Sequence, residues 1–347
     1  MAVTLKQIAQ MTGLSIPTVS DVLNKKGELY KPETRQRVLD AARSLGYHPN
    51  AAARAMTTGR FGTVALLLST KPHFSYLPTE LLEGIHDALA ERELNLMLSK
   101  LPDEKLVSED FVPTVLKQWM VDGLLINYIN ELPEPLARTL HQFRLPSVYI
   151  NIKREFDSVY VDDLAGARVA TQRLIDLGHR SIAYLHLSQT ELEATSLGHY
   201  SARDRHAGFA HAMRSAGLAP RALFGGPQLP FCEWSARIAV ELKQSDRPTA
   251  VLTYGNGEAS AVLAAARLAG LSVPRDLSVI TFANAPMVEP DLALATMVLP
   301  WREIGSAGVT ALLNKIATKT VNVPSQALTA ALCGADSLSK ARTRIKC

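Results

Sequence analysis

The stretch TLKQIAQMTGLSIPTVSDVLN, residues 4–24, carries the clearest structural pattern of the 347-residue chain. Ala9, Gly13 and Val19 follow one another at intervals of four and six residues. Where two short helices cross at a tight turn, a small residue permits the crossing, a glycine permits the turn and a branched apolar residue fills the contact. The stretch therefore predicts a helix-turn-helix, although an ordinary helical hairpin could show the same three residues.

Capping residues and apolar spacing extend this prediction to three consecutive helices. Thr4 followed by Gln7 matches a capping box, and Ser15 is placed to cap the second helix. From about Pro32 to Leu45 apolar residues recur at helical spacing, and Gly46 permits the left-handed conformation that ends a helix. We expect Val19 to point into the core of this bundle and its polar neighbours to point outward.

The positive charge of the chain is concentrated at its N-terminus. Residues 1–60 hold nine Lys and Arg against four acidic residues, which gives +5, so the net charge of +4 leaves −1 for the remainder. A basic segment on a nearly neutral body indicates contact with phosphates, because each cation that neutralises a phosphate releases counterions. Together with the helix-turn-helix it favours DNA binding over the alternative of a merely solvated basic face.

From Gly62 onward, apolar strands alternate with amphipathic helices. The predicted strands are residues 63–69, 94–99, 123–128, 146–151, 158–162, 181–187, 249–254 and 277–282. The predicted helices are residues 80–92, 112–120, 165–178, 204–216, 235–244 and 258–269. Apolar strands separated by helices indicate parallel sheets covered on both faces, and this number of strands fits two sheets. Tandem α/β subdomains of this kind bind ligands at the carboxyl ends of their strands.

Composition and motifs argue against several other classes of protein, namely membrane, disulfide-rich, zinc-binding and dinucleotide-binding proteins. No run of about 18 apolar residues is present and the N-terminus lacks the order of a signal peptide, so we expect a cytoplasmic protein without membrane contact. Cys232, Cys333 and Cys347 lie far apart, which fits neither a disulfide framework nor a zinc site. TYGNGEAS, residues 253–260, matches a dinucleotide fingerprint only in part, because Ser260 replaces the third glycine. We expect no cofactor, no metal and no enzymatic activity.

Two polar features of the larger segment are expected to be structural. Asp162 and Asp163 look like a metal pair, but neighbours at a strand end point apart, so helix capping is the preferred interpretation. His179, in LGHRS, is expected to pack or cap rather than to catalyse.

Several stretches occur together in the order typical of one known family. The opening stretch, TRQRVLDAARSLGYHPNAAARAM (34–56), LIDLGHRSIAYL (174–185), RDRHAGF (203–209) and LPWREIG (299–305) resemble the lactose/galactose repressor family of bacterial transcription regulators. The resemblance implies a helix-turn-helix domain, a hinge helix that enters the minor groove, and a periplasmic-binding-protein-like core of two doubly wound α/β subdomains that the chain crosses three times. It also implies a homodimer on palindromic double-stranded operator DNA, controlled by a small-molecule effector. Repression is the default expectation, with activation left open.

The implied domain boundaries are 1–46 for the helix-turn-helix, 47–61 for the hinge helix and linker, and 62–347 for the effector-binding and dimerisation core. Within the core, residues 62–161 and 296–324 form the first subdomain, and residues 162–295 and 325–347 form the second.

The resemblance assigns DNA contacts to Thr4, Ser15, Ile16, Pro17, Thr18, Ser20, Asp21, Asn24, Lys31, Asn50, Ala53 and Met56. Ile16 and Pro17 hold the positions that discriminate the operator sequence, and Met56 holds that of an apolar wedge between base pairs. Asp21 replaces the common arginine, so it cannot pair with guanine; it could accept from a cytosine amine or simply lower the affinity. Lys31 replaces a capping Ser or Thr and offers a phosphate contact instead.

The resemblance assigns effector binding to Phe74, Asn151, Arg205, Trp234, Asn256 and Trp301. The planar guanidinium of Arg205 suits hydroxyl or carboxyl groups, and aromatic rings stack on sugars or bases. Sugar-binding members place acidic residues on ligand hydroxyls, whereas Asn151, Gly255, Asn256 and Ala283 stand at or beside those positions here. We therefore hypothesise a carbohydrate-like effector, such as a sugar acid, with a purine or nucleoside as the alternative.

Overall fold

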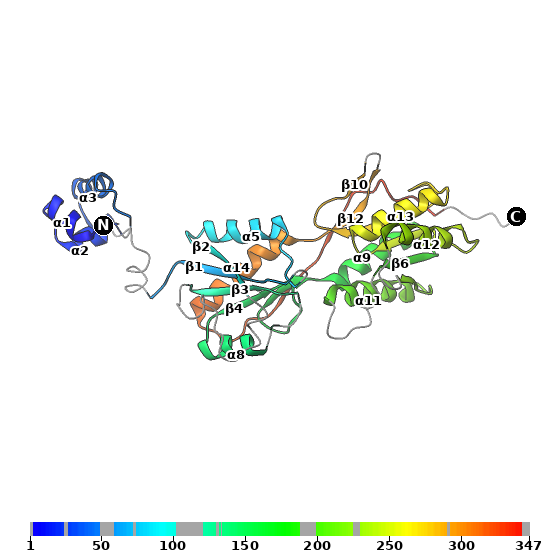
Figure 1. Ribbon diagram of the computed structural model, residues 1–347, viewed down its shortest axis with the longest axis horizontal. Helices are drawn as coiled ribbons and strands as arrows, with labels where there is room; N and C mark the ends of the chain where they lie inside the picture. Colours follow the sequence, from blue (N-terminus) through cyan, green and yellow to red (C-terminus); the bar gives the residue numbers. More distant parts are fainter. Residues whose placement is uncertain are drawn as a thin grey trace. The chain divides into compact units, whose positions relative to one another are not determined.

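The computed structural model describes residues 3–23, 27–48, 59–71, 74–101, 121–129, 132, 134–187, 199–224, 230–289 and 292–341. The chain divides into two compact units, Met1–Gly62 and Thr63–Cys347 (Figure 1). The boundary expected between linker and core, after residue 61, falls one residue before this division.

The first unit contains three α-helices, as the sequence predicts. They are α1 (Leu5–Thr12), α2 (Ile16–Asp21) and α3 (Pro32–Ser44), with a short 3-10 turn, η2 (Gly27–Leu29), before α3. Their buried side chains form one small cluster: Ile8, Ala9, Val19, Val22, Val38, Ala41 and Ala42. Ala9 and Val19 therefore lie at the helix crossing that their spacing predicted.

The predicted capping residues hold the ends of these short helices. The backbone N–H of Thr4 donates to Oε1 of Gln7 at 2.8 Å, and Oγ of Ser15 accepts from the backbone N–H of Thr18 at 3.2 Å. Gly13 has φ 64°, a left-handed conformation that glycine adopts without steric cost. These local bonds satisfy groups that a helix end leaves unpaired, so the helix-turn-helix is specified largely by neighbouring residues.

The second unit contains two six-stranded sheets and a two-stranded ribbon. The first sheet has the order β13-β5-β4-β3-β1-β2, and all its pairings are parallel. Its strands are β1 (Thr63–Ser69), β2 (Asn95–Leu101), β3 (Gly123–Asn127), β4 (Ser147–Ile150), β5 (Ser158–Val161) and β13 (Gln326–Leu328). Its helices are α5 (Thr79–Ala90), α8 (Glu134–Phe143) and α14 (Trp301–Thr318).

Strand β1 shows why this sheet is covered on both faces. Leu66 and Leu68 belong to the cluster that also contains residues of α5 and α14, whereas Ala65 and Leu67 belong to the cluster that contains Leu136 of α8. Successive side chains of a strand point to opposite faces, so a strand buried on both faces must be apolar throughout.

The second sheet has the order β14-β12-β9-β8-β6-β7, and only β14 runs antiparallel to its neighbour, β12. Its strands are β6 (Ile182–His186), β7 (Arg221–Phe224), β8 (Ala250–Thr253), β9 (Ser278–Ala283), β12 (Ala295–Val298) and β14 (Ala331–Cys333). Helices α9 (Asp163–Asp176) and α11 (Tyr200–Ser215) share one buried cluster with this sheet. Helices α12 (Phe231–Lys243) and α13 (Asn256–Leu268) share another. The ribbon pairs β10 (Val288–Glu289) with β11 (Leu292–Ala293).

The chain crosses between the two sheets three times, as predicted, but two crossings lie elsewhere than expected. Residues 296–298 were expected in the first subdomain, yet they belong to β12, which pairs with β9 of the second sheet. Residues 326–328 were expected in the second subdomain, yet they form β13, which pairs with β5 of the first sheet. These strands are short, and their partners are set by long-range pairing that local patterning does not reveal.

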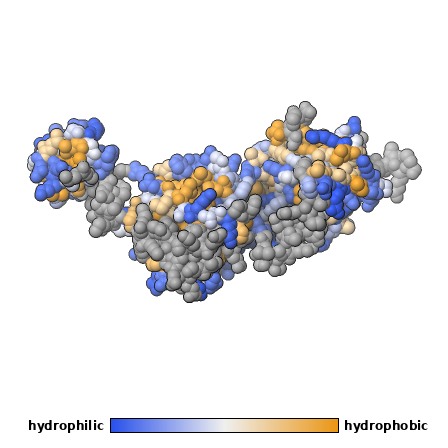
Figure 2. Space-filling view, in the orientation of Figure 1, coloured by the Kyte–Doolittle hydropathy of each residue, from blue (hydrophilic) through white to orange (hydrophobic). Residues whose placement is uncertain are grey.

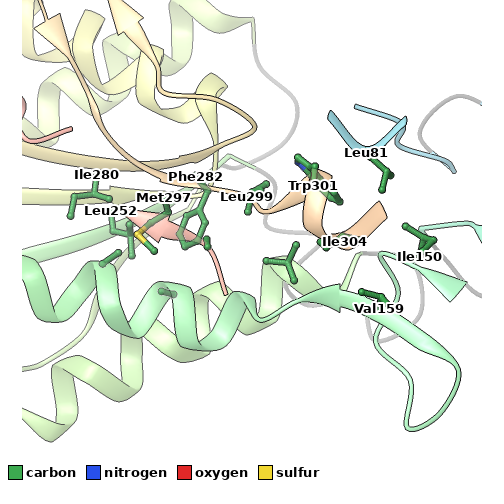
Figure 3. Close-up of a cluster of buried hydrophobic side chains, with 14 of the residues drawn as sticks. Leu81, Ile150, Val159, Leu252, Ile280, Phe282, Met297, Leu299, Trp301 and Ile304 are labelled. Carbon is green, nitrogen blue, oxygen red and sulfur yellow. The ribbon is translucent and has the colours of Figure 1, made fainter. Parts of the chain in front are cut away.

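Apolar packing is continuous along the crossing that joins β12 to α14. Figure 3 shows Ile280, Phe282 and Met297 of the second sheet followed by Leu299 and Trp301, and then the first-sheet side of the same buried cluster. Trp301 is 3% exposed. The start of α14 is therefore anchored in the core of this unit.

The structure adds helices and strands that the sequence analysis did not name: α8, α14 and the strands β7, β10, β11, β12, β13 and β14. The helix expected at 112–120 lies outside the described residues. Among the described residues, no helix is both long enough and apolar enough to span a bilayer.

Candidate functional site

Helix α2 presents a small exposed surface beside its buried face. Val19 is fully buried, whereas Ile16 is 46% exposed and Pro17 is also exposed. The hydroxyl of Thr18 lies 2.8 Å from that of Ser15, so both belong to the polar start of the helix. The residues expected to discriminate base sequence are therefore available to a partner.

Asp21 has a partner that the sequence analysis did not foresee. The hydroxyl of Tyr30 donates to Oδ2 of Asp21 at 2.9 Å. The two roles considered for Asp21 from the sequence, acceptance from a cytosine amine and a loss of affinity, did not include this intramolecular bond.

Of the other predicted DNA contacts, Thr4, Ser20 and Lys31 lie among the described residues. Lys31 is the N-cap of α3 and makes no capping bond through its side chain, in keeping with its replacement of a capping hydroxyl. Asn24, Asn50, Ala53 and Met56 lie outside the described residues.

The second unit contains an open cavity of about 330 Å³. Its lining is Tyr76, Ile129, Asn151, Val161, Asp163, His199, Ser201, Arg205, Tyr254, Gly255, Asn256, Phe282, Ala283, Asn284, Leu299 and Trp301. Asn151, Tyr254 and Asn284 each follow the carboxyl end of a strand, β4, β8 and β9 respectively. The cavity thus lies where the sequence analysis expected a ligand, and both sheets contribute to it.

A buried ion pair occupies the floor of this cavity. Nε of Arg205 donates to Oδ1 of Asp163 at 2.6 Å, and the two side chains are 8% and 1% exposed. A second guanidinium nitrogen donates to the carbonyl of Tyr254 at 2.6 Å, and the guanidinium carbon lies 4.2 Å from the centre of the Phe282 ring. Burial raises the pKa of Asp163, and the adjacent guanidinium opposes that rise.

This pair removes the basis for an acidic ligand. The hypothesis of a sugar acid rested on a cleft with fewer carboxylates and a retained arginine. The positive charge of Arg205 is balanced by Asp163, so the structure does not support the sugar acid.

Two acceptor oxygens of the lining have no hydrogen-bond partner within the described part of the chain. They are Oδ1 of Asn151 and Oδ2 of Asp163, on residues that are 3% and 1% exposed. A buried acceptor left without a donor is costly, commonly by about 1–3 kcal/mol. Both residues line the cavity, so a bound molecule could donate hydrogen bonds to these oxygens once their side chains turn toward it.

Aromatic and amide groups from both sheets meet at another side of the cavity. Nε1 of Trp301 donates to Oδ1 of Asn284 at 2.8 Å, and Nδ2 of Asn284 donates to the hydroxyl of Tyr76. The rings of Tyr76 and Trp301 lie edge to face with centroids 5.7 Å apart. The structure thus places a series of hydrogen-bonded polar groups beside the aromatic rings of the lining.

The structure brings four of the six predicted effector residues together. Asn151, Arg205, Asn256 and Trp301 line the cavity. Phe74 and Trp234 are not part of that lining. The carbonyl of Phe74 accepts from the backbone N–H of Ile129 at 2.8 Å. Trp234 lies on α12, 6% exposed, with the guanidinium of Arg237 5.7 Å from its ring centre.

The sequence analysis missed much of the remaining lining, including Tyr76, Asp163, His199, Tyr254, Phe282 and Asn284. Tyr254, Phe282 and Asn284 stand at or just beyond the ends of predicted strands, so the carboxyl-end rule could have selected them. No local signal distinguishes Asp163 from Asp162.

The capping role expected of Asp162 and Asp163 holds for the first of them only. Oδ1 of Asp162 accepts from the backbone N–H of Ala165 at 2.9 Å and caps α9, whereas Asp163 pairs with Arg205 in the cavity lining. His179 packs in the interior, as expected. His179 is 2% exposed, and its ring nitrogens lie 2.9 Å from Oγ1 of Thr249 and 3.1 Å from Oγ of Ser278.

His199 joins the start of α11 to the first sheet. Its Nε2 donates to the carbonyl of Asn151 at 2.8 Å, and Nδ1 lies 2.7 Å from Oγ of Ser201. Burial lowers the pKa of His199 from 6.5 to about 4, although the Asn151 carbonyl partly opposes the shift. The ring is therefore neutral at pH 7 and adds no charge to the cavity.

We expect His199→Gln to change how stability depends on pH. Between about pH 6.5 and about pH 4 the unfolded chain binds a proton at this ring more readily than the folded chain, so the parent loses stability as the pH falls. At pH 5 this loss amounts to about 2 kcal/mol. The variant should be less stable than the parent at pH 7.5, through its lost bond to Asn151, and should regain about 2 kcal/mol relative to the parent at pH 5.

Urea unfolding followed by tryptophan fluorescence measures this difference, because Trp119, Trp234 and Trp301 all belong to the second unit. His86→Gln is the control at pH 7.5, because the His86 side chain is 69% exposed and the same substitution there shows the effect of replacing a histidine at the surface. A difference between variant and parent that is the same at both pH values would contradict the expectation.

Comparison with known proteins agrees with the fold. Residues 4–50 match the model for bacterial regulatory proteins of the lacI family, and residues 171–334 match that for a periplasmic binding protein-like domain. The chain is 31% identical over 328 residues to the HTH-type transcriptional repressor PurR of Erwinia tasmaniensis, and 30% identical over 328 residues to that of Serratia proteamaculans. Each alignment covers 91% of this chain and 91% of the relative.

Solved structures show the same architecture. The lac repressor dimer bound to operator and the anti-inducer ONPF superposes with a TM-score of 0.73 at 22% identity, covering 98% of this chain and 100% of that one. The transcriptional regulator CelR in complex with cellobiose superposes with a TM-score of 0.61 at 25% identity, covering 96% and 99%.

A helix-turn-helix unit, followed by a unit whose two largely parallel sheets both line one cavity, defines a DNA-binding regulator with a periplasmic-binding-like core. The chain belongs to the lacI family of bacterial regulatory proteins. It is a DNA-binding transcriptional repressor of that family and not an enzyme.

Proposed function

We propose that this repressor responds to a small, uncharged molecule that donates several hydrogen bonds and binds in the cavity of the second unit. The observation that carries the proposal is the pair of buried acceptors, Oδ1 of Asn151 and Oδ2 of Asp163, in the lining of one cavity. A bound hydroxyl or amino group would satisfy either of them.

The charges of the cavity favour a neutral ligand. Asp163 and Arg205 are opposite charges in contact, and His199 is neutral at pH 7. A ligand carboxylate would compete with Asp163 for Arg205 and would lie close to the Asp163 carboxylate. Like charges at short range in a buried site are unfavourable.

The rings of the lining favour a cyclic ligand with an apolar face. Tyr76, Phe282 and Trp301 line the cavity together with the acceptors. A sugar or sugar derivative combines an apolar ring face with several hydroxyl donors, so it is the first candidate. A purine or nucleoside is the second, because the same rings would stack on a base and an exocyclic amine would donate.

We further propose that two copies of the chain bind a palindromic operator. Ile16 and Pro17 would read bases, while Thr4, Ser15, Thr18, Ser20 and Lys31 would contact the backbone or base edges. The solved lac repressor similar to this chain is a dimer bound to operator. Large apolar residues of the second unit are exposed, including Leu98, Val240, Leu268 and Val288, and apolar areas interrupt the polar surface of that unit in Figure 2. Such areas are suited to an interface between subunits. A DNA-binding repressor would act in the cytoplasm, where bacterial DNA lies.

The proposal is tested by titrating the full-length protein with ligands of the three chemical types. The panel is glucose, galactose and ribose, then glucuronate and galacturonate, then adenine and guanine. The operator is first selected by the protein from random duplexes. We expect calorimetry to show binding of at least one neutral compound, and the same compound to change operator affinity several-fold to about a hundredfold.

Two variants of Asn151 serve as matched tests. Asn151 has φ 60°, which glycine also adopts, so Asn151→Gly removes the acceptor without backbone strain. We expect Asn151→Gly to weaken ligand binding about tenfold and Asn151→Asp, which keeps an acceptor oxygen, to retain most of it. Tight binding of a sugar acid with none of the neutral compounds would show that the proposed ligand chemistry is wrong.

A further inference from the structure

The bond between Tyr30 and Asp21 joins the end of α2 to the start of α3. The two residues are nine positions apart, and the Tyr30 hydroxyl donates to Oδ2 of Asp21 at 2.9 Å. Both residues are half-buried. The hydrogen bond to Asp21 raises the pKa of Tyr30, as a negatively charged acceptor should.

Thr18, a second polar residue of α2, partly opposes the rise in the pKa of Tyr30. Thr18 and Asp21 are three residues apart, so they are neighbours on the helix surface. Thr18 in turn lies 2.8 Å, hydroxyl to hydroxyl, from Ser15, the N-cap of α2. Tyr30 therefore bonds to α2 at Asp21, three residues after the threonine of the Ser15–Thr18 pair.

We propose that Asp21 is a positioning residue for DNA recognition: it holds Tyr30, and with it the start of α3, against α2, and it reads no base. The proposal rests on the DNA binding of this unit. It replaces the two roles considered from the sequence, acceptance from a cytosine amine and a simple loss of affinity.

The physical reason lies in what the bond connects. Ile16 and Pro17 are on α2, where they would read base edges, whereas Lys31 directly follows Tyr30 and occupies the N-cap position of α3. Phosphate contacts set the register of a protein on the duplex, and base contacts then specify the sequence. A fixed link between α2 and α3 keeps these two kinds of contact in one register. The Asp21 carboxylate repels DNA phosphates, so it does not strengthen DNA binding directly. The link to Tyr30 explains its presence on α2 better.

The test compares Asp21→Ala, Asp21→Asn, Tyr30→Phe and the double variant Asp21→Ala with Tyr30→Phe in the full-length protein. Each is measured by fluorescence anisotropy against the wild-type operator and against a scrambled duplex at one salt concentration. We expect Asp21→Ala and Tyr30→Phe each to lower the ratio of operator affinity to scrambled-duplex affinity about tenfold. The double variant should be no worse than either single variant, because both break the same bond.

Asp21→Asn separates positioning from charge. Its amide oxygen still accepts from Tyr30, so it should keep the ratio within about threefold of the parent while binding every duplex more tightly. Asp40→Ala is the matched control, because Asp40 lies on α3, is 56% exposed, and its loss changes the net charge by the same amount. It should tighten binding to both duplexes without changing their ratio.

Repeating the selection from random duplexes with each variant completes the test. We expect Asp21→Ala and Tyr30→Phe to prefer the same bases as the parent, less strongly. A change of preferred base at one position with Asp21→Ala, but not with Tyr30→Phe, would overturn the proposal and make Asp21 a base-reading residue. An Asp21→Ala variant that behaves like Asp40→Ala would also overturn it. A parent protein that selects no duplex would overturn the DNA binding itself.

Discussion

Asp163→Asn is expected to lower the free energy of unfolding of the second unit by about 3–5 kcal/mol, because it leaves the buried charge of Arg205 without its anion. The Arg205 side chain is 8% exposed and lies 2.6 Å from the carboxylate. Water cannot replace Asp163 as a partner at such a site as it could at the surface. Urea unfolding followed by tryptophan fluorescence reports on this unit alone.

The double variant Arg205→Met with Asp163→Asn separates the pair from its surroundings. Removing both charges avoids an uncompensated buried ion, so the double variant should lose less stability than the sum of the two single variants. Glu91→Gln is the surface control, because Glu91 is 75% exposed and lies 3.6 Å from Arg92. It should change stability by less than about 1 kcal/mol. Additive losses from the two single variants would show that the pair is not coupled.

Gly84→Ala should cost about 3 kcal/mol of unfolding free energy, even though alanine favours a helix by about 1 kcal/mol over glycine. Gly84 lies on α5 where this helix meets α14, and an added Cβ would overlap the carbonyl oxygen of Arg302. From the other side, a Cβ on Gly305 would lie 2.6 Å from the carbonyl oxygen of Leu81. The two helix backbones are in contact, so a methyl group must push them apart.

Gly257→Ala is the matched control for this substitution. Gly257 is in the first turn of α13, and an added Cβ there would meet no atom within 4 Å. We expect its stability to stay within about 0.5 kcal/mol of the parent or to rise slightly. Because α14 begins at Trp301 in the cavity lining, Gly84→Ala should also weaken ligand binding, which calorimetry would detect. Parent-like stability for Gly84→Ala would mean that the helices can separate without loss.

The local elements of this protein were predictable because local interactions specify them. A capping residue bonds to a backbone group within three or four positions, and a glycine such as Gly13 sets its own backbone angle. The helix-turn-helix follows from such contacts. The strands were predictable because β1 is buried on both faces and is therefore apolar along its length. The class of protein followed from these same patterns.

The cavity could be predicted only in outline. The rule that ligands bind at the carboxyl ends of strands gave the general location of the cavity. The resemblance to the repressor family then selected Asn151, Arg205, Asn256 and Trp301 correctly as lining residues. It did not separate Phe74 from Tyr76, two positions apart, because the path of the chain after β1 decides which of them faces the cavity.

By itself, the sequence determined the helix-turn-helix, most of the strands and the carboxyl-end location of the cavity, since each depends on residues close together in the chain. Only the tertiary structure decided that Asp163 balances the charge of Arg205, 42 residues away, and that Tyr30 bonds to Asp21. It also decided that β12 belongs to the second sheet and β13 to the first. Each of these depends on which distant segments meet. That choice follows from the packing of the whole unit, and it leaves no periodic or short-range pattern in the chain.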